Sequence, residues 1–333
     1  MENSNKIVPP HLNAEVYRSD TTGTSTMSYF DHISINEENR VLIGCSELTG
    51  RYWNGGAIIH TSVSEGKNPQ NIPKKNIHLS SGTADGCFLG KLDKLLLCQD
   101  NGSVSIWSSS CDEVWKMWSE DVSVAEHDDA VLAVDCLTPE TEYVTAGADG
   151  NIKVWDVNEM ICTHNYIAAH SMSICGVAVL PNSKSFVTGS LDEYISLWDE
   201  VVDKPIVDLV KNDCGVRCVQ WINENKLIFG DESGVLSLVD ARNPKSIIRL
   251  KEFPAAVHRI AINRNSDKVA VCCDNKIVSV CAINADDSAE VIYYDRHTHG
   301  NIVRGLAWDG REDLVLHTVG WDGEMKSHDI VTN

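Results

Sequence analysis

The chain has 333 residues and a formal net charge of −20, from 28 Lys and Arg against 48 Asp and Glu. This acidity argues against a nucleic-acid partner, because a phosphate backbone needs a basic face; it favours basic partners such as Arg-rich peptides, with solubility alone as the alternative role of the charge. There is no apolar run near the ~20 residues of a membrane span and no apolar signal core at the N-terminus, so we expect a cytoplasmic or nuclear location with reduced thiols.

Similar segments recur along the chain, with corresponding positions 41 to 48 residues apart. In the clearest copies a strand of small residues runs into an Asp-led turn, and Trp follows that Asp by six residues. In chain order the copies are 40–60, which is degenerate and interrupted by a long loop, then 100–107, 146–156, 188–199, 231–240, 273–280 and 318–329. A period of this size marks a repeat architecture whose units bury their apolar faces by stacking.

Each repeat is expected to supply four short strands. In the third unit these are predicted at Val131–Cys136, Tyr143–Gly147, Ile152–Trp155 and Ile161–Tyr166, separated by Pro- and Gly-containing turns. Short, evenly spaced strands of this kind are typical of a β-propeller. The units resemble WD repeats, and the sequence predicts an all-β, seven-bladed WD40 β-propeller that occupies residues 1–333 as a single domain.

The last repeat appears too short to complete its own blade. Eleven residues follow Asp322, which leaves no length for a fourth strand. We therefore expect an N-terminal extension, residues 1–28, to contribute the strand that closes the ring, through either Ile7-Val8 or Val16-Tyr17.

Sets of His, Thr and Asp invite comparison with catalytic triads, but they recur with the repeat. The complete sets are His127, Thr145, Asp149 with Trp155 and His170, Thr188, Asp192 with Trp198. A catalytic site occurs once, whereas a structural network returns in each unit, and His299, Thr318 and Asp322 repeat the pattern without Trp. In WD repeats generally, such residues form a buried hydrogen-bonded chain. We expect structural tetrads, no catalytic residues and no enzyme activity.

Metal and cofactor sites are not expected either. The 12 cysteines show no Cys-x-x-Cys spacing. His297-Thr298-His299 would place two imidazoles on one face of a strand, but a third ligand is missing and His299 already belongs to a structural set. There is no Gly-rich phosphate loop in the sequence.

The loop of the first repeat, Glu47–Gly56, differs from the other turns. It places Arg51, Tyr52 and Trp53 together, flanked by glycines, and these three residue types are enriched at interaction hot spots. Trp53 could instead fold back and plug its own degenerate blade. We predict that Arg51, Tyr52 and Trp53 bind a partner protein.

Several motifs, spread over most of the chain, resemble the family of methylosome WD-repeat subunits: Gly50–Gly55 after Ile43–Ser46, Glu126–Asp129, Phe229–Gly234 with Ser237–Asp240, and Thr318–Asp322. The resemblance implies a non-enzymatic scaffold that binds and stabilises a type II protein arginine methyltransferase, with Arg51 and Trp53 matching the docking loop of the family. It also implies presentation of Arg-Gly-rich substrates, such as Sm proteins and histones, for symmetric arginine dimethylation.

A substrate receptor of a cullin-RING ubiquitin ligase is the alternative. Such WD proteins use a Trp-Asp-x-Arg ending, which Val239-Asp240-Ala241-Arg242 matches in part. The missing Trp weakens this reading. So does Glu200-Val201 after Trp198-Asp199, where Arg would be required.

Overall fold

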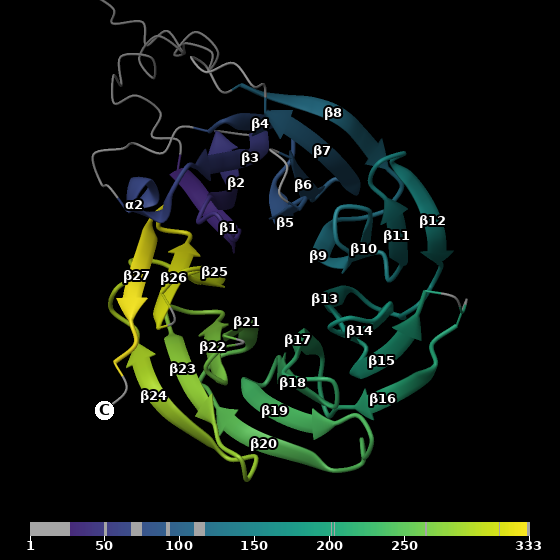
Figure 1. The fold of residues 1–333 in the computed structure, drawn as a ribbon, viewed down its shortest axis with the longest axis vertical. Helices are drawn as coiled ribbons and strands as arrows, with labels where there is room; N and C mark the ends of the chain where they lie inside the picture. The colour runs from purple at the N-terminus through teal and green to yellow at the C-terminus, as the bar shows by residue number, and fades with distance from the viewer. Residues whose placement is uncertain are drawn as a thin grey trace, which may run out of the picture.

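Seven antiparallel sheets stand as blades around a central axis in the computed structural model (Figure 1). The structure describes residues 27–49, 52–67, 75–90, 94–109, 117–200, 202, 204–263, 265–312 and 314–331. The blades follow one another in chain order, and six of them have four described strands. The fold is a seven-bladed β-propeller, which confirms the predicted fold class.

Each blade takes consecutive strands from the channel outward. Blade 1 has β1 (Met27–Ile35), β2 (Val41–Thr49), β3 (Tyr52–His60) and β4 (Ile77–Leu79); blade 2 has β5 (Thr83–Phe88), β6 (Lys94–Gln99), β7 (Ser103–Ser109) and β8 (Trp118–Ala125); blade 3 has β9 (Val131–Thr138), β10 (Glu142–Gly147), β11 (Ile152–Asp156) and β12 (Ile161–Tyr166). Blade 4 has β13 (Ile174–Val179), β14 (Ser185–Ser190), β15 (Tyr194–Asp199) and β16 (Val207–Lys211); blade 5 has β17 (Val216–Trp221), β18 (Lys226–Asp231), β19 (Val235–Asp240) and β20 (Ile247–Glu252). Blade 6 has β21 (Val257–Asn263), β22 (Lys268–Cys273), β23 (Val278–Ile283) and β24 (Ala289–Asp295), and blade 7 has β25 (Val303–Trp308), β26 (Val315–Gly320) and β27 (Met325–Asp329).

The position of a strand within its blade decides its residue pattern. The second strands, such as β10 and β14, are buried along almost their whole length between neighbouring blades, and they consist mainly of apolar and small residues. The outer strand β12 alternates exposed and partly buried residues, because one of its faces meets solvent. This difference explains why the sequence placed the four strands of blade 3 within two residues of their observed bounds.

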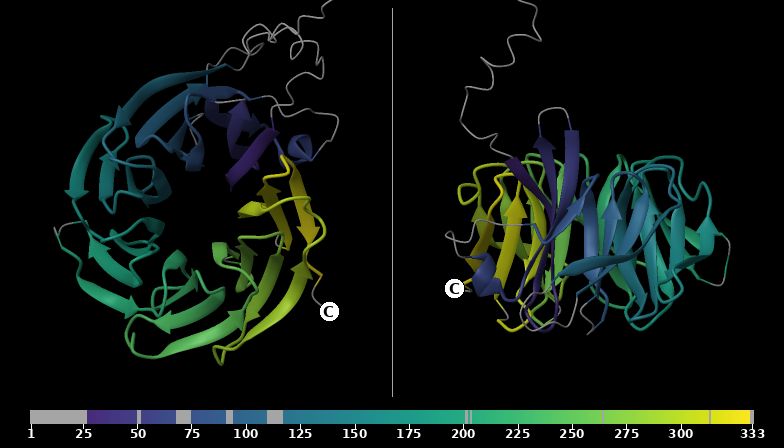
Figure 2. Two further views of the ribbon diagram at one scale, coloured as in Figure 1. Left: turned by 180° about the vertical axis from the view of Figure 1, so that it is seen from behind. Right: turned by 90° about the horizontal axis from the view of Figure 1, so that it is seen from above.

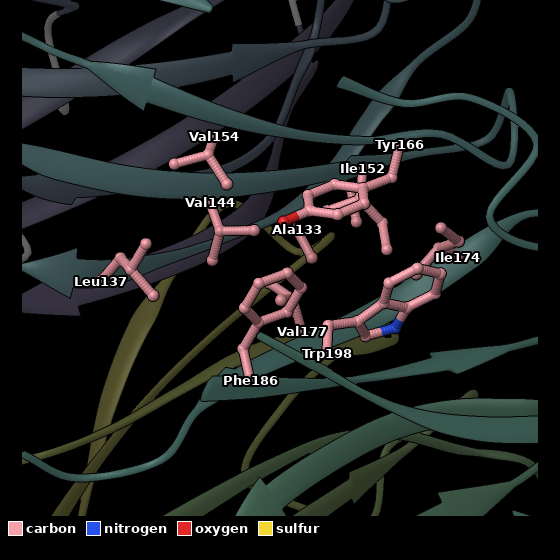
Figure 3. Packing of buried hydrophobic residues seen from close by; sticks show 11 residues of the cluster. Ala133, Leu137, Val144, Ile152, Val154, Tyr166, Ile174, Val177, Phe186 and Trp198 are labelled. Atoms are coloured by element: carbon pink, nitrogen blue, oxygen red, sulfur yellow. The ribbon is translucent and has the colours of Figure 1, made fainter. Parts of the chain in front are cut away.

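Apolar side chains fill the space between adjacent blades. Figure 3 shows such a cluster between blades 3 and 4, where Trp198 packs edge-on against Tyr166, with ring centroids 5.3 Å apart, and stacks on Phe186 at 6.5 Å. Since every blade buries its faces against two neighbours, the ring is stabilised as a whole. None of the described helices has the length and apolar character needed to cross a membrane.

Blade 7 meets blade 1 at the closure of the ring. Among the described residues blade 7 has three strands, and the predicted N-terminal closing strand lies outside the described residues. The Trp321 indole donates a hydrogen bond across the closure to Asp31, 2.9 Å away. The short helix α2 (Val63–Gly66) adds Val63 to an apolar cluster that includes Met325 of blade 7.

The predicted long loop of blade 1 is wrong. Residues 47–49 and 52–56 belong to β2 and β3, which pair up to Thr49 opposite Tyr52 and form a hairpin that rises above the neighbouring blades (Figure 2). Its glycines suggested a loop, but they serve close packing: a Cβ on Gly55 would lie 2.2 Å from the carbonyl oxygen of Ser81. Aromatic residues beside them favour a strand.

Candidate functional site

The predicted tetrad of blade 3 is a continuous hydrogen-bonded chain. The Trp155 indole donates to the Thr145 hydroxyl at 2.8 Å, and that hydroxyl lies 3.0 Å from Nε2 of His127. Nδ1 of His127 is 3.0 Å from the Asp149 carboxylate. Burial lowers the pKa of His127, against the opposing effect of Asp149, so the ring is neutral at pH 7. A neutral ring that donates from Nδ1 and accepts at Nε2 satisfies every member of the chain.

Blade 4 repeats this chain with nearly the same geometry. The Trp198 indole and Nε2 of His170 each lie 2.8 Å from the Thr188 hydroxyl, and Nδ1 of His170 lies 2.9 Å from Asp192. In both blades the Asp carboxylate also accepts backbone N–H groups of its own turn and of the residue after the His. The chain therefore ties the third strand to the turn and to the connector from the preceding blade.

Blade 7 keeps the chain with His328 in place of Trp. Nε2 of His328 lies 2.9 Å from the Thr318 hydroxyl, which lies 2.7 Å from His299, and His299 in turn lies 2.9 Å from Asp322. The other ring nitrogen of His328 lies 2.8 Å from the hydroxyl of Tyr293 in blade 6. The recurrence in three blades and the burial of all the His side chains suit a structural role.

A central cavity of about 680 Å³ runs between the inner strands of all seven blades. Three arginines line it, and each is paired: Arg217 and Arg304 both lie 3.1 Å from Asp274. Arg259 of blade 6 reaches Asp85 of blade 2 at 3.1 Å, a contact that bridges the channel between two non-adjacent blades. Because Arg217 and Arg304 share one carboxylate, these pairs offset only part of the positive charge of the three arginines.

At one end of the cavity, aromatic and acidic side chains of blades 1, 2 and 7 converge. We call this corner the mouth site; its residues are Tyr29, Asp31, Ser46, Trp53, Asp100 and Trp321, and all but Tyr29 line the cavity. Tyr29 stacks on Trp53, with centroids 6.1 Å apart and planes 12° apart, and meets Trp321 edge-on at 5.7 Å. Tyr29 thus contacts both indoles and helps to fix their positions.

Each indole of the mouth site faces a carboxylate. Trp321 donates to Asp31, which also accepts from the Ser46 hydroxyl. Trp53 hydrogen-bonds Asp100 at the rim. A Cβ atom on Gly82 would lie 2.3 Å from an Asp100 oxygen and 2.6 Å from the Ser46 hydroxyl. The glycine at this connector therefore leaves room for these polar groups.

Of the three predicted contact residues, the structure describes the backbone of Tyr52 and all of Trp53, both on β3. Arg51 and the side chain of Tyr52 lie outside the described residues. Trp53 is 46% exposed and sits directly opposite Leu48, which is 47% exposed, so both project from the same face of the hairpin. Trp53 therefore does not plug the core of blade 1, although its contacts with Tyr29 and Asp100 mean that it is not free either.

No metal centre is formed in the part of the chain that the structure describes: no three His, Cys, Asp or Glu side chains gather there in a suitable cluster. His297 is exposed, while the adjacent His299 is engaged with Thr318 and Asp322. The eleven cysteines that the structure describes carry free thiols, and burial raises the pKa of most of them, including Cys272 and Cys273.

Replacement of Asp31 by Asn is expected to stabilise the protein at neutral pH. Burial raises the pKa of Asp31 to about 6, against opposing hydrogen bonds from Ser46 and Trp321 and the charge of Arg304. Because this pKa is higher than in an unfolded chain, the wild type loses stability as the pH rises from about 4 to 6. The Asn side chain can accept from Trp321 through its oxygen and donate to the Ser46 hydroxyl through its NH2 group, without the charge. Asp31→Asn should therefore add about 1 to 3 kcal/mol above pH 7.

Urea unfolding at pH 7.5 and at pH 5 measures this effect, and the gain should shrink at the lower pH. A variant that is less stable than the wild type at pH 7.5 would show that the Asp31 carboxylate stabilises the fold rather than destabilising it. The sign matters for function, since a carboxylate that weakens the fold is expected to serve another purpose.

Comparison with known proteins agrees with the repeat geometry. The family described as WD domain, G-beta repeat matches residues 120–156 and 160–199, the two segments that carry the complete tetrads, so these are WD40 repeats. The chain is 26% identical over 303 residues to methylosome protein WDR77 of Xenopus laevis, covering 90% of this chain and 88% of that protein. It is 22% identical over 321 residues to Protein valois of Drosophila melanogaster, covering 90% and 86%.

Another relative is matched over a shorter part of the chain. WD repeat-containing protein 37 of Xenopus tropicalis is 23% identical over 206 residues, which are 60% of this chain and 41% of that protein. Unlike this partial match, the similarity to the methylosome protein covers 90% of the chain. The chain is thus similar to a methylosome WD-repeat protein at modest identity.

The mouth site was missed by sequence reasoning. Tyr29 and Asp31 lie before the first recognised strand, and Trp321 was counted only as part of the last repeat. A Trp immediately before the tetrad Asp322 is unlike the small or aliphatic residues before Asp149 and Asp192. This contrast was the one signal available in the sequence.

Proposed function

We propose that the protein is a non-catalytic adaptor of a methylosome, which binds and stabilises a type II protein arginine methyltransferase. The observation that carries the proposal is the projecting β2–β3 hairpin with its exposed pair Leu48 and Trp53, in a chain similar along most of its length to a methylosome WD-repeat protein. Because the His, Thr and Asp sets of the chain recur as structural networks, binding is the function that the propeller suits best.

The hairpin has the properties of a docking element. Its two strands are nine residues long, against five to eight for the strands of blades 2 to 7, so the paired ends of β2 and β3 stand clear of the disc (Figure 2). Trp53 is held by Tyr29 and Asp100, and a preordered aromatic loses little conformational freedom on binding. Arg51, beside it in the sequence, would supply hydrogen bonds to a carboxylate of the methyltransferase.

The second part of the proposal concerns substrates. A net charge of −20 gives the protein an acidic field that attracts cationic chains. Arg-Gly-rich tails, such as those of Sm proteins and histones, are the substrate class that this charge suits, and the methyltransferase would convert their arginines to the symmetric dimethylated form. We place this activity in the cytoplasm and the nucleus.

Affinity capture with the full chain distinguishes this proposal from a role as a ubiquitin-ligase receptor. A type II methyltransferase should dominate the recovered partners, and its recovery should fall with Leu48→Asp, which puts a charge on the exposed face of the hairpin. Recovery of a cullin adaptor instead, lost on Arg242→Ala, would overturn the proposal. In the structure Arg242 pairs with its own Asp240 at 2.6 Å.

A further inference from the structure

We propose that the mouth site of the central cavity binds the guanidinium group of an arginine side chain. The inference rests on the proposed adaptor function only for the source of that arginine, a substrate tail. The binding chemistry itself follows from the charges and rings of the site, and it deepens the proposal by giving the substrate a place on the propeller.

The charges of the cavity are unbalanced at the mouth site. Among the ion pairs of the described residues, Arg217 and Arg304 share Asp274, and Arg259 pairs with Asp85. Asp31 lies within the electrostatic influence of Arg304 but forms no ion pair with it, and it accepts hydrogen bonds from Trp321 and Ser46. Asp100 accepts from the Trp53 indole and has no cation in the described ion pairs. Two carboxylates close enough to influence one another favour a cation between or beside them.

The rings beside these carboxylates suit a planar cation. Trp53 and Trp321 both line the cavity, and the face of an indole is the strongest cation–π partner among side chains. The site already demonstrates this contact, because the guanidinium of Arg304 lies 5.1 Å from the centroid of Trp321. A second guanidinium from outside would find the exposed indole of Trp53, which has no cation over it among the described contacts.

Arginine fits better than lysine. Guanidinium presents several N–H donors in one plane and stacks on aromatic rings, so it can hydrogen-bond a carboxylate while lying against an indole. An ammonium group has neither the planar fork of donors nor a flat face to stack on an indole. An Asp100 oxygen and the Ser46 hydroxyl lie together over Gly82, and that hydroxyl is hydrogen-bonded to Asp31, so the acceptors of the mouth site suit the broader donor.

The electrostatics of Asp31 supply a second signature. Its carboxylate faces Ser46 on β2, Trp321 and Arg304 on blade 7, and Asp100 on blade 2, and burial raises its pKa to about 6. A bound cation stabilises the ionised form. Affinity for an arginine side chain should therefore fall as the pH drops from 7.5 to 5.5, and Asp31→Asn should remove much of that dependence.

The probe is the blocked peptide acetyl-Gly-Arg-Gly-Arg-Gly-amide, titrated into the full chain by calorimetry at pH 7.5. Peptides with Lys or citrulline in place of Arg serve as comparisons. The Arg peptide should bind, and Asp31→Asn with Asp100→Asn should weaken its binding at least about tenfold. Asp213→Asn, at a side chain 90% exposed between blades 4 and 5, is the matched control and should change nothing.

Indole N–H resonances locate the site. Those of Trp53 and Trp321, assigned with Trp53→Phe and Trp321→Phe, should shift on addition of the Arg peptide, while that of the buried Trp155 should not. Equal binding of the citrulline or Lys peptide, or no saturable binding of the Arg peptide, would overturn the inference. Unchanged affinity of the Asp31→Asn, Asp100→Asn double variant for the Arg peptide would also overturn the inference. If the double variant fails to fold, the affinity of Asp100→Asn alone is the test, because the Asp100 carboxylate lies at the rim.

The same variants separate this inference from the adaptor function. Asp31→Asn and Asp100→Asn should keep the affinity for the methyltransferase, whereas Leu48→Asp should lose it and keep the peptide. A wild-type chain that binds the Arg peptide but no methyltransferase would leave the mouth site standing and reject the adaptor proposal. The reverse result would reject the mouth site alone.

Discussion

Replacement of Trp155 or Trp198 by Ala should lower the free energy of unfolding by about 3 to 5 kcal/mol, the usual cost of removing a large buried aromatic side chain. Both side chains are buried. Trp198 packs between Tyr166 and Phe186, so its loss opens a cavity between two blades. It also removes the donor that ends the hydrogen-bonded chain at Thr188.

Phe substitution separates the two contributions. Trp198→Phe keeps much of the apolar contact and loses the indole N–H, so it should lower the free energy of unfolding by less than Trp198→Ala does. The difference between the two variants measures the contribution of the packing. Ile167→Ala, at a side chain 75% exposed near the same tetrad, should leave the denaturation midpoint unchanged. Midpoints near the wild-type value for both Trp→Ala variants would mean that the tetrads do not stabilise the ring.

Loss of the hairpin side chains should separate binding from folding. Trp53→Ala should weaken methyltransferase binding by about 2 kcal/mol or more, at least about thirtyfold in affinity. Its own stability should fall by about 1 to 2 kcal/mol, because the stack on Tyr29 and the bond to Asp100 are lost. Leu48→Ala touches neither contact and should weaken binding with the melting temperature unchanged.

Ile247→Ala, on the outer strand of blade 5, is the control for an exposed apolar side chain away from the hairpin. Melting temperature and affinity are measured on the same protein preparation. Intact binding by Trp53→Ala together with lost stability would make Trp53 a structural residue of the mouth site and refute the docking assignment.

The fold was predictable because its information is local and repeated. Each blade rests on a turn, an apolar alternation and a position for Trp, and these recur even where single members are replaced, as Val239 and His328 show. The tetrads followed from the same recurrence, since residues that return at fixed spacing occupy equivalent places. Their partners in space are set within one blade and its preceding connector.

The hairpin and the mouth site were less accessible. In blade 1, Gly55 is required by close backbone contact with Ser81 in the next connector, and Gly56 by contact with Ile77 on β4, which no local pattern reveals. The mouth site joins residues as distant as Asp31 and Trp321, and it exists only because blade 7 closes on blade 1. Contacts that depend on ring closure have no signal in a single repeat.

Hydrogen–deuterium exchange of the full chain, with and without the methyltransferase, tests the central claim most directly. The hairpin tip is one of the few elements that stand clear of the disc, so its amides report contact with a partner. We predict slowed exchange on binding across residues 47–54, and loss of this protection in Leu48→Asp. Protection centred on another blade, or no change in the hairpin at a saturating concentration of methyltransferase, would contradict the proposed docking surface.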